Sequence, residues 1–507
     1  MNRAGGLHPG LGWTLATAVV LGLLIWLLPR QKTPGGMTGE QPALVVYCAA
    51  GIQSPVQEVA REFEKLYGVK IQLQYGGSGT LLANLKVSKI GDLFIPGDES
   101  YITLGKQQGL LAEVLPLAHQ VPVIIVRRGN PAKIQTVKDL LRTGIKVSLA
   151  NPEAASIGTI VKRVLSASGD WAALEAQTRK SGVFKPTVND VANDVKLGAV
   201  DAGVVWDATA QQYPALEMVR VPEFAQAGQT ISVAVLNSTR QSALALRFAR
   251  YLGARDKGLK AFTRWHYSVA EGDAWAEIPQ ITLFSGAMLR PGVEQTLKDF
   301  EQREGVRINT IYNGCGILTS QMRAGQRPDA YFACDTSFMK SVQDLYHDSV
   351  TISENEILII VPKGNPQKIQ TVEDLTKPGL RLGLAHPEKS AMGALTKNML
   401  VAMGRYEAVC RNLKLDSPTG DFLINQLRTG SLDAIIACRS NAQNVREHVE
   451  VIRIDHPLAT AVQPYGVAKS TQYQQLMTRL LEMIESPASS NRFTGAGFYW
   501  RFQARTN

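Results

Sequence analysis

Three loops in the first part of the chain combine small residues with hydroxyl groups: "CAAGIQS" (48–54), "GGSGT" (76–80) and "PGDES" (96–100). Each follows an apolar run and precedes a helical pattern, so each should expose the unpaired N–H groups of a helix N-terminus. Such termini carry partial positive charge and bind anions without a basic side chain. Ser78 and Thr80 add hydroxyl donors. Small residues that allow close backbone approach are Ala49, Ala50, Gly51, Gly76, Gly77, Gly79 and Gly97. These loops predict a small-anion site; the alternative is that they are ordinary turns and caps.

Catalytic patterns are weak. Ser78 lies in no GxSxG elbow, the seven histidines form no HExxH, and "YGGSGTLL" has neither GxGxxG nor a following GK[ST]. Asp92 with Asp98, repeated as Asp329 with Asp335, fits a strand start and a helix cap better than an acid pair. We therefore expect a binding protein that is not an enzyme and uses no cofactor.

The chain is internally duplicated. "GNPAKIQTVKDL" (129–140) returns as "GNPQKIQTVEDL" (364–375). "YGGSGTLLANLK" likewise pairs with "YNGCGILTSQMR", and "GDLFIPGDESYI" with "PDAYFACDTSFM", in the same order. Such a long period excludes a solenoid repeat. The sequence predicts two homologous domains, residues 44–268 and 281–507, joined by a linker at 269–280.

Each half alternates strand and helix patterns. The run "LVVY" (44–47) precedes a helix in which Ser54 should be the cap, Pro55 should occupy the first turn and Gly68 should end the helix. Two more strand–helix pairs start at "VKIQLQY" and "DLFI". The apolar residues of the first helix keep the helical period: Val56, Val59, Ala60, Phe63 and Leu66. This order predicts an α/β fold with a parallel, doubly wound sheet that binds ligands at the carboxyl ends of its strands.

Composition narrows the partners and the compartment. The net charge of +10 is dispersed, with no basic run, so no nucleic-acid partner is expected. Five cysteines without CxxC argue against a disulfide scaffold or a zinc ribbon. Residues 11–28 carry no charge and, as a helix, would span about 27 Å. We interpret 1–10 as a cytoplasmic N-terminus, 11–28 as a signal anchor in the cytoplasmic (inner) membrane and 29–43 as a linker, with a cleaved signal peptide as the alternative.

Each half resembles the periplasmic substrate-binding proteins of type II topology, most closely their molybdate-binding branch. The resemblance is carried by "YCAAGI" and "FSGAML", "YGGSGTL", "GDLFIPGD" and "PDAYFACD", "NPEAASIG" and "HPEKSAMG", and "VDAGVVW". It implies two lobes per half, joined by two crossing strands, with an oxyanion held between them by neutral hydrogen bonds. "VPVIIVRR" and "EILIIVPK" resemble the crossing strands, so the repeated line after them should be a surface turn and helix start on the second lobe.

The resemblance also implies site residues. In the first half these are Ala50, Gly51, Ser78, Gly79, Gly97, Ile157, Val191 and Trp206. Their second-half counterparts are Ala287, Met288, Cys315, Cys334, Met392 and Cys438. A family serine is replaced by Gly51, while Ser78 matches a second serine and Trp206 stands for a family tyrosine. The expected ligand is a tetrahedral oxyanion, molybdate or tungstate before sulfate or phosphate, delivered to an ABC permease at the extracytoplasmic face.

The second half keeps fewer of these groups. Its thiols Cys315, Cys334 and Cys438 either fill a pocket that no longer binds, hold a soft metal such as Cu(I), or form a disulfide. The alternative for the whole chain is a membrane-anchored sensor or scaffold whose receptor-like domains signal rather than feed a permease.

Overall fold

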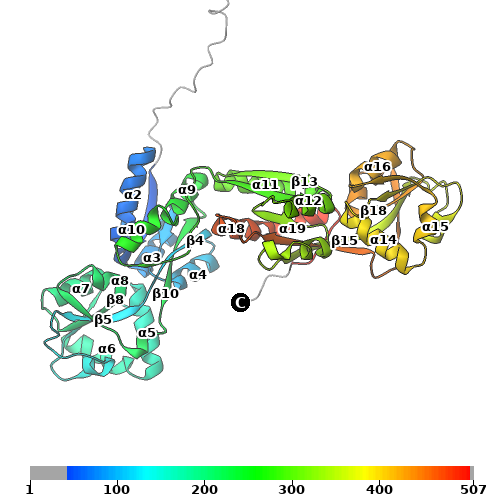
Figure 1. Ribbon diagram of the computed structural model, residues 1–507. Helices are drawn as coiled ribbons and strands as arrows, with labels where there is room; N and C mark the ends of the chain where they lie inside the picture. Colours follow the sequence, from blue (N-terminus) through cyan, green and yellow to red (C-terminus); the bar gives the residue numbers. More distant parts are fainter. Residues whose placement is uncertain (1–42, 503–507) are drawn as a thin grey trace, which may run out of the picture. The chain divides into compact units, whose positions relative to one another are not determined.

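The computed structural model describes residues 43–502, and from Leu44 onward these belong to one compact unit. They form two consecutive α/β units, and each unit has two lobes (Figure 1). The expected signal anchor at 11–28 lies outside the described residues. Within 43–502 no helix is both long and apolar enough to cross a membrane.

The first lobe of the first half is a six-stranded sheet in the order β11-β4-β10-β3-β1-β2. Its strands are β1 (Leu44–Ala49), β2 (Ile71–Gly76), β3 (Leu93–Ile95), β4 (Leu111–Gln120), β10 (Gln229–Leu236) and β11 (Ser268–Val269). Its helices are α2 (Gln53–Tyr67), α3 (Ser78–Ser88), α4 (Glu99–Gln107), α9 (Ser242–Leu252) and α10 (Gly258–Arg264). The predicted parallel order holds for β2, β1 and β3, but β10 is antiparallel to β3. The sheet is mixed because β10 returns from the second lobe.

The second lobe of the first half has the strand order β7-β6-β8-β5-β9. These strands are β5 (Pro122–Arg127), β6 (Val147–Ala150), β7 (Val183–Lys185), β8 (Ala202–Trp206) and β9 (Leu216–Val219). The helices are α5 (Ser156–Ser168), α6 (Trp171–Ser181), α7 (Val188–Lys196) and α8 (Asp207–Gln211), with 3-10 turns η2 (Val137–Leu141) and η3 (Pro222–Phe224). Only Val121 separates β4 from β5, so the predicted crossing strand leads directly from one lobe to the other.

The second half repeats this plan with one difference: its crossing strand is unbroken. β15 (Val350–Pro362) pairs with β20 in the first lobe and with β18 in the second, which merges both lobes into one ten-stranded sheet. The other strands are β12 (Gln280–Gly286), β13 (Arg307–Asn313), β14 (Ala330–Phe332), β16 (Leu382–Ala385), β17 (Leu413–Ser417), β18 (Ala434–Cys438), β19 (Val449–Arg453), β20 (Thr460–Val467) and β21 (Tyr499–Trp500).

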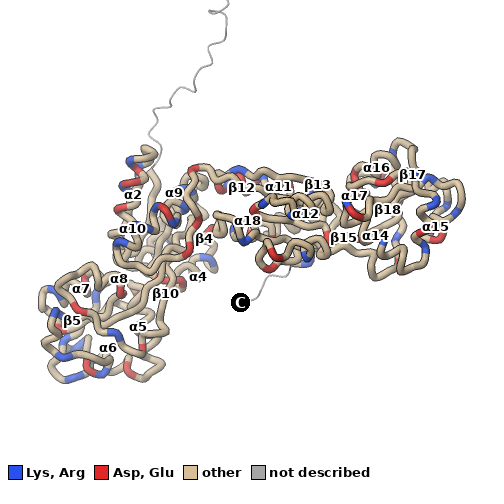
Figure 2. The backbone as a smooth tube through the Cα atoms, viewed as in Figure 1, with Lys and Arg blue, Asp and Glu red and all other residues tan. Residues whose placement is uncertain are grey.

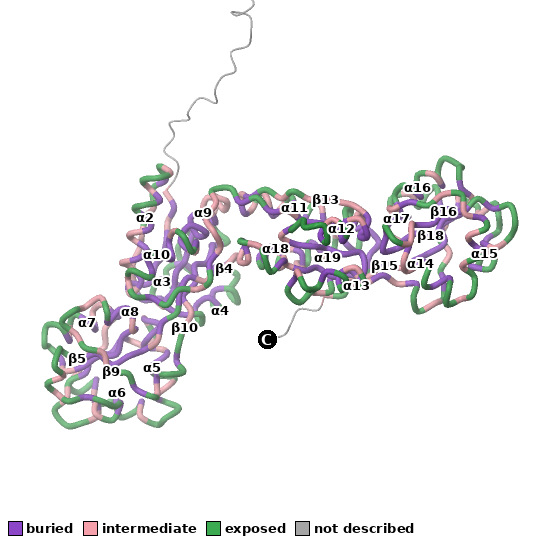
Figure 3. Tube along the Cα trace, viewed as in Figure 1, coloured by how far each residue is buried: buried purple, intermediate pink, exposed green. Residues whose placement is uncertain are grey.

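Helices cover this sheet, and most strands are buried while the outer helix faces are exposed (Figure 3). The helices are α11 (Arg290–Glu304), α12 (Cys315–Arg323), α13 (Thr336–Lys340), α14 (Ala391–Ala402), α15 (Tyr406–Cys410), α16 (Gly420–Arg428), α17 (Arg439–Gln443), α18 (Gln474–Ile484) and α19 (Pro487–Gly495). Acidic and basic residues alternate along the chain without a large single-sign stretch (Figure 2).

The first helix shows where local sequence signals succeed and fail. Val56 and Phe63 of α2 are fully buried, and Gly68 ends the helix with φ 68°, as predicted. Ser54 is not the cap, however, because the 3-10 turn η1 (Ala50–Ile52) runs directly into α2 and makes Ile52 the flanking residue. The Ser54 hydroxyl instead donates to Gln212 Oε1 at 2.9 Å. Leu66, also expected on the buried face, is 54% exposed.

The repeated segments 129–140 and 364–375 fold the same way in both halves. Asn130 and Asn365 have φ of 44° and 42°, and their side-chain amides donate to the carbonyl oxygens of Ile134 and Ile369 at 2.8 and 2.7 Å. Asparagine tolerates this left-handed conformation better than most residues. A 3-10 turn follows each, η2 in the first half and η6 (Glu373–Thr376) in the second. Each repeated segment is a surface turn of the second lobe of its half, as predicted, and it belongs to the scaffold.

Candidate functional site

The carboxyl ends of β1, β2 and β3 meet the starts of α5 and α7 and the end of β8 around one cavity between the lobes of the first half. The cavity volume is about 20 Å³, enough for one water-sized molecule. An oxyanion therefore needs the lobes to separate slightly before it can enter. No Lys or Arg lines this cavity within the described part of the chain. Of the predicted site residues, the structure brings these to its wall: Ala50, Gly51, Ser78, Gly97 and Trp206.

Ser78 is the best-positioned hydroxyl. It is the first residue of α3, the flanking Gly77 makes no side-chain cap, and the Ser78 side chain is buried. The Gly97 N–H donates to Ser78 Oγ at 2.9 Å. Because a hydroxyl has one proton and two lone pairs, this bond leaves the Ser78 proton free to donate to a ligand in the cavity. Ser78 is therefore oriented by a backbone donor and is not used as a helix cap.

The two lobes are joined by hydrogen bonds to backbone carbonyl oxygens. Gly79 N–H donates to the Ala154 carbonyl oxygen at 2.9 Å, and Asn189 Nδ2 donates to the Ala50 carbonyl oxygen at 2.9 Å. A Cβ at Gly77 would lie 2.3 Å from the Ala154 oxygen, so glycine is required at this close approach. Gly79 thus joins the lobes at the edge of the cavity, and its N–H is already used in this closed arrangement.

Two predicted donors sit behind the cavity wall. Ile157 is the second residue of α5, where an N–H has no intrahelical acceptor, and its side chain is in the core of the second lobe. Val191 lies one turn into α7; its N–H donates to the Thr187 carbonyl oxygen at 3.4 Å and its side chain is also in that core. The part of α7 that reaches the cavity is Thr187 and Val188.

Two polar residues at or near the site were not predicted from the sequence: Ser156 lies within the quoted "NPEAASIG", and Thr209 lies outside the motifs. Ser156, at the start of α5, adds a buried hydroxyl to the cavity wall. Thr209 on α8 is buried, and its Oγ1 makes no hydrogen bond of good geometry within the described residues. The neighbouring Tyr267 hydroxyl donates to the Gly51 carbonyl oxygen at 2.5 Å instead. Thr209 Oγ1 lies 3.5 Å from where a Cβ of residue 51 would stand.

One carboxyl group stands beside the cavity. Asp98 caps α4, as predicted, by accepting from Ser100 N–H at 2.7 Å. Burial raises the pKa of Asp98 above its ordinary value, and the hydrogen bonds from Ser100 offset this only in part. A protonated Asp98 does not repel an anion, whereas an ionised one does. The site therefore favours anions through helix termini and hydroxyls, with Asp98 as the opposing group.

The second half preserves the geometry but changes the atoms. Cys334 N–H donates to Cys315 Sγ at 3.2 Å, in the place of the bond from Gly97 to Ser78. Gly316 N–H donates across the lobes to the Lys389 carbonyl oxygen at 3.1 Å, as Gly79 does to Ala154. All five cysteines of the chain are free in the structure. The other second-half counterparts lie in matching elements: Ala287 and Met288 in η4 (Ala287–Leu289), Met392 in α14 and Cys438 at the end of β18.

Comparison with known proteins identifies the family. The sequence model of the family described as "Bacterial extracellular solute-binding protein" matches residues 44–268 and again 281–499. These two matches cover most of the chain, and the chain therefore belongs to this family as a tandem of two solute-binding units.

Among curated proteins, the chain is 30% identical over 226 residues to the molybdate-binding protein ModA of Mycobacterium tuberculosis H37Rv, covering 44% of this chain and 84% of that protein. It is 28% identical over 141 residues to a sulfate-binding protein of Synechococcus elongatus, covering 25% of this chain and 40% of that one. The solved periplasmic molybdate-binding protein of Azotobacter vinelandii shares 20% identity with a TM-score of 0.38, covering 45% of this chain and 99% of that one.

Proposed function

We propose that the first half, residues 44–268, is an extracytoplasmic receptor that binds a tetrahedral oxyanion of the molybdate or tungstate type for an ABC importer. The observation that carries this proposal is the Ser78 hydroxyl, which accepts from Gly97 N–H at 2.9 Å and keeps its proton for a ligand. Helix starts from both lobes and the hydroxyl of Ser156 in the cavity wall support it. Relatives named as molybdate-binding proteins favour the same ligand class.

The proposal extends to how the chain is used. The proposed receptor would pass its ligand to a membrane partner, and an ABC permease is the partner that such receptors serve. The uncharged run at 11–28 would tether the receptor to the outer face of the cytoplasmic membrane. Mass spectrometry of the membrane fraction tests this part, because a mature chain starting near Thr33 would exclude the tether.

Substitution of Ser78 tests the site. Loss of one hydrogen bond to a charged ligand costs about 1.5 to 3 kcal/mol, so Ser78→Ala should weaken oxyanion binding by about 10- to 150-fold. Calorimetric titration of the full chain with molybdate, tungstate, sulfate and phosphate measures this effect and ranks the ligands. Ser88→Ala, at the exposed end of the same helix, is the matched control and should leave affinity unchanged. Unchanged affinity in Ser78→Ala would place the site elsewhere.

A further inference from the structure

Sulfur-bearing side chains stand at most of the second-half positions that match the predicted first-half site. The chain has only 11 Met and 5 Cys among 507 residues. Yet five of the six second-half counterparts predicted from the sequence carry sulfur, the exception being Ala287. The first-half residues at those places carry none: Gly51, Ser78, Gly97, Ile157 and Trp206. The sulfur-bearing set is Met288, Cys315, Cys334, Met392 and Cys438, called the sulfur cluster below; all five are buried.

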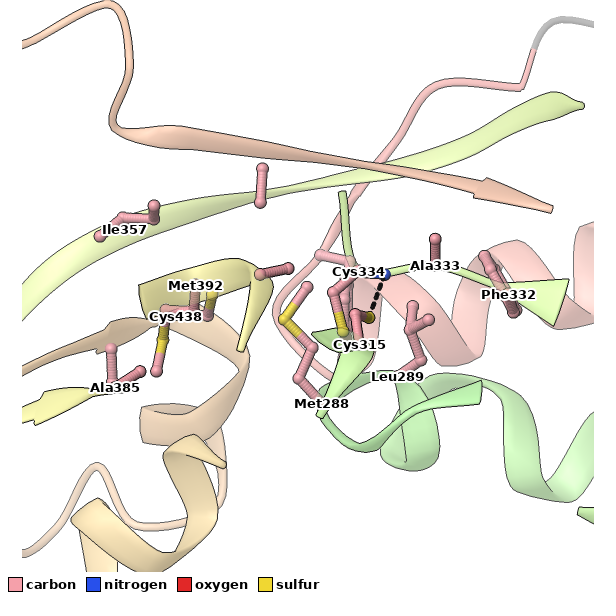
Figure 4. Packing of buried hydrophobic residues seen from close by; sticks show 14 of the residues in the cluster. Met288, Leu289, Cys315, Phe332, Ala333, Cys334, Ile357, Ala385, Met392 and Cys438 are labelled. Atoms are coloured by element: carbon pink, nitrogen blue, oxygen red, sulfur yellow. Dashed lines mark hydrogen bonds between the residues drawn. The ribbon is translucent and has the colours of Figure 1, made fainter. Parts of the chain in front are cut away.

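The first lobe holds its sulfurs in fixed positions. Cys315 Sγ accepts the Cys334 N–H at 3.2 Å. A Cβ built on Gly286 would lie 3.1 Å from Cys315 Sγ and would overlap Cys334 Sγ, so both thiols rest against the same backbone atom. Figure 4 shows the sulfur of Met288 beside these two thiols, facing Met392 and Cys438 of the second lobe.

A second change makes room for the thiol of Cys334. The first half has Ala49 and Gly97 at the two positions where the second half has Gly286 and Cys334. Position 286 lacks the methyl group that Ala49 carries in the first half, and any side chain at position 286 would collide with Cys334 Sγ. Such a complementary exchange is what a close-packed interior requires to accept the larger residue. The sulfur cluster is therefore accommodated by its surroundings.

The chemistry of the cluster does not suit an oxyanion. The hydroxyls of Ser78 and Ser156 are replaced by the thiol of Cys315 and the methyl group of Ala391, and thiols are weak hydrogen-bond donors. Two carboxylates lie close to the cluster: Asp335 follows Cys334 in the chain, and Asp421 accepts from the Asn441 side chain at 2.9 Å. The same Asn441 side chain accepts from the Cys438 N–H at 3.2 Å. These carboxylates favour a cation over an anion, and thiols and thioethers select soft ions such as Cu(I).

We propose that the second half binds one soft monovalent cation, with the chemistry of Cu(I), through Cys315, Cys334 and Met288, with Met392 and Cys438 approaching from the other lobe. The proposal concerns a different site and does not rest on oxyanion binding by the first half. Each thiol that coordinates the ion releases its proton to solvent, so binding changes no oxidation state. No group of three or more His, Cys, Asp or Glu in residues 43–502 is arranged to hold a metal; the thioether of Met288 completes the first-lobe set.

Anaerobic copper titration of the full chain tests the proposal. Cu(I), added as its acetonitrile complex, competes between the protein and a coloured chelator, bicinchoninate, whose absorbance reports the copper withdrawn. The wild type should withdraw one equivalent. Loss of even an outer-shell partner of a metal weakens binding about 10- to 100-fold, so Cys315→Ser and Cys334→Ser should each weaken it by about 100-fold or more. Met288→Leu, which keeps volume and removes the sulfur, should weaken it less.

Cys410→Ser is the matched control, because this thiol lies in the same half but in α15, outside the cluster. It should bind copper as the wild type does. Unfolding temperatures of the copper-free variants check that each variant folds, and molybdate titration of Cys315→Ser should match the wild type. X-ray absorption of the copper complex should show sulfur neighbours alone. Absence of copper uptake by the reduced wild type, or a Cys315–Cys334 disulfide that persists in mild reductant, would overturn the proposal.

Discussion

Position 51 of the first-half site is a glycine with little room for a side chain. A Cβ there would lie 2.9 Å from Val188 Cγ2 and 3.7 Å from Trp206 Cδ1. Val188 therefore fills the space that a serine at position 51 would need, and the buried hydroxyl of Thr209 lies 3.5 Å from the same point. Position 51 is thus enclosed by three side chains from different elements, α7, β8 and α8.

This contact predicts a non-additive pair of substitutions. Gly51→Ser alone should lower the stability of the protein by about 1 to 3 kcal/mol, because it overpacks a closed interior. Val188→Ala should remove the collision, so the double variant should be more stable than the sum of the single changes predicts. Thermal unfolding of the three variants measures the coupling, and oxyanion titration of the double variant shows whether the restored hydroxyl binds. Simple additivity would mean that residues 51 and 188 do not compete for space.

At the scale of elements, sequence reasoning located the loops but missed some contacts between them. The Gly-rich turns and the capping role of Asp98 could be predicted because each depends on residues adjacent in the chain, whereas the crossing strands were expected from the family resemblance. The antiparallel β10 could not, because its partner β3 is remote in sequence. Thr209 was missed for the same reason: its closeness to position 51 depends on how one lobe meets the other.

The cap of α4 gives a pH-dependent prediction. Because the pKa of Asp98 is raised in the folded state, the folded protein holds this proton more tightly, and stability falls as pH rises from 3.8 through the folded pKa. Asp98→Asn keeps the acceptor for Ser100 N–H and cannot ionise. Its unfolding temperature relative to the wild type should therefore increase from acid to neutral pH, and its oxyanion affinity at pH 7 should rise.

Asp98→Ala removes both the charge and the cap, and the loss of the cap should lower stability by about 1 kcal/mol. Comparing it with Asp98→Asn separates the effect of the charge from that of the cap. If the gap between Asp98→Asn and the wild type does not change between pH 4 and pH 7, the carboxyl group is ionised throughout and its burial has no such effect.

At the scale of the whole molecule, the two halves share a buried ionic cluster. Glu304 of α11 is 1% exposed and accepts from Arg250 of the first half at 3.0 Å and from Arg479 of α18 at 2.6 Å. Burial tends to raise the pKa of Glu304, but the two guanidinium groups outweigh it and lower that pKa. For Arg250 burial prevails and its pKa falls, whereas for Arg479 the charge of Glu304 prevails and its pKa rises; both arginines stay protonated at neutral pH.

This cluster makes the tandem a coupled unit. Glu304→Gln would leave two buried guanidinium groups without a counter-charge, and breaking a buried ion pair in this way costs about 3 to 5 kcal/mol. Because the folded pKa of Glu304 is lowered, the contribution of the native carboxylate is present above its ordinary pKa of 4.5 and is lost as pH falls through the folded value. Calorimetry of the wild type should therefore show a stability gap over Glu304→Gln at pH 7 that narrows in acid.

Glu294→Gln, on the exposed face of the same helix, is the control and should change stability by no more than about 1 kcal/mol. Equal unfolding temperatures for Glu304→Gln and Glu294→Gln would show that this buried cluster does not stabilise the contact between the halves.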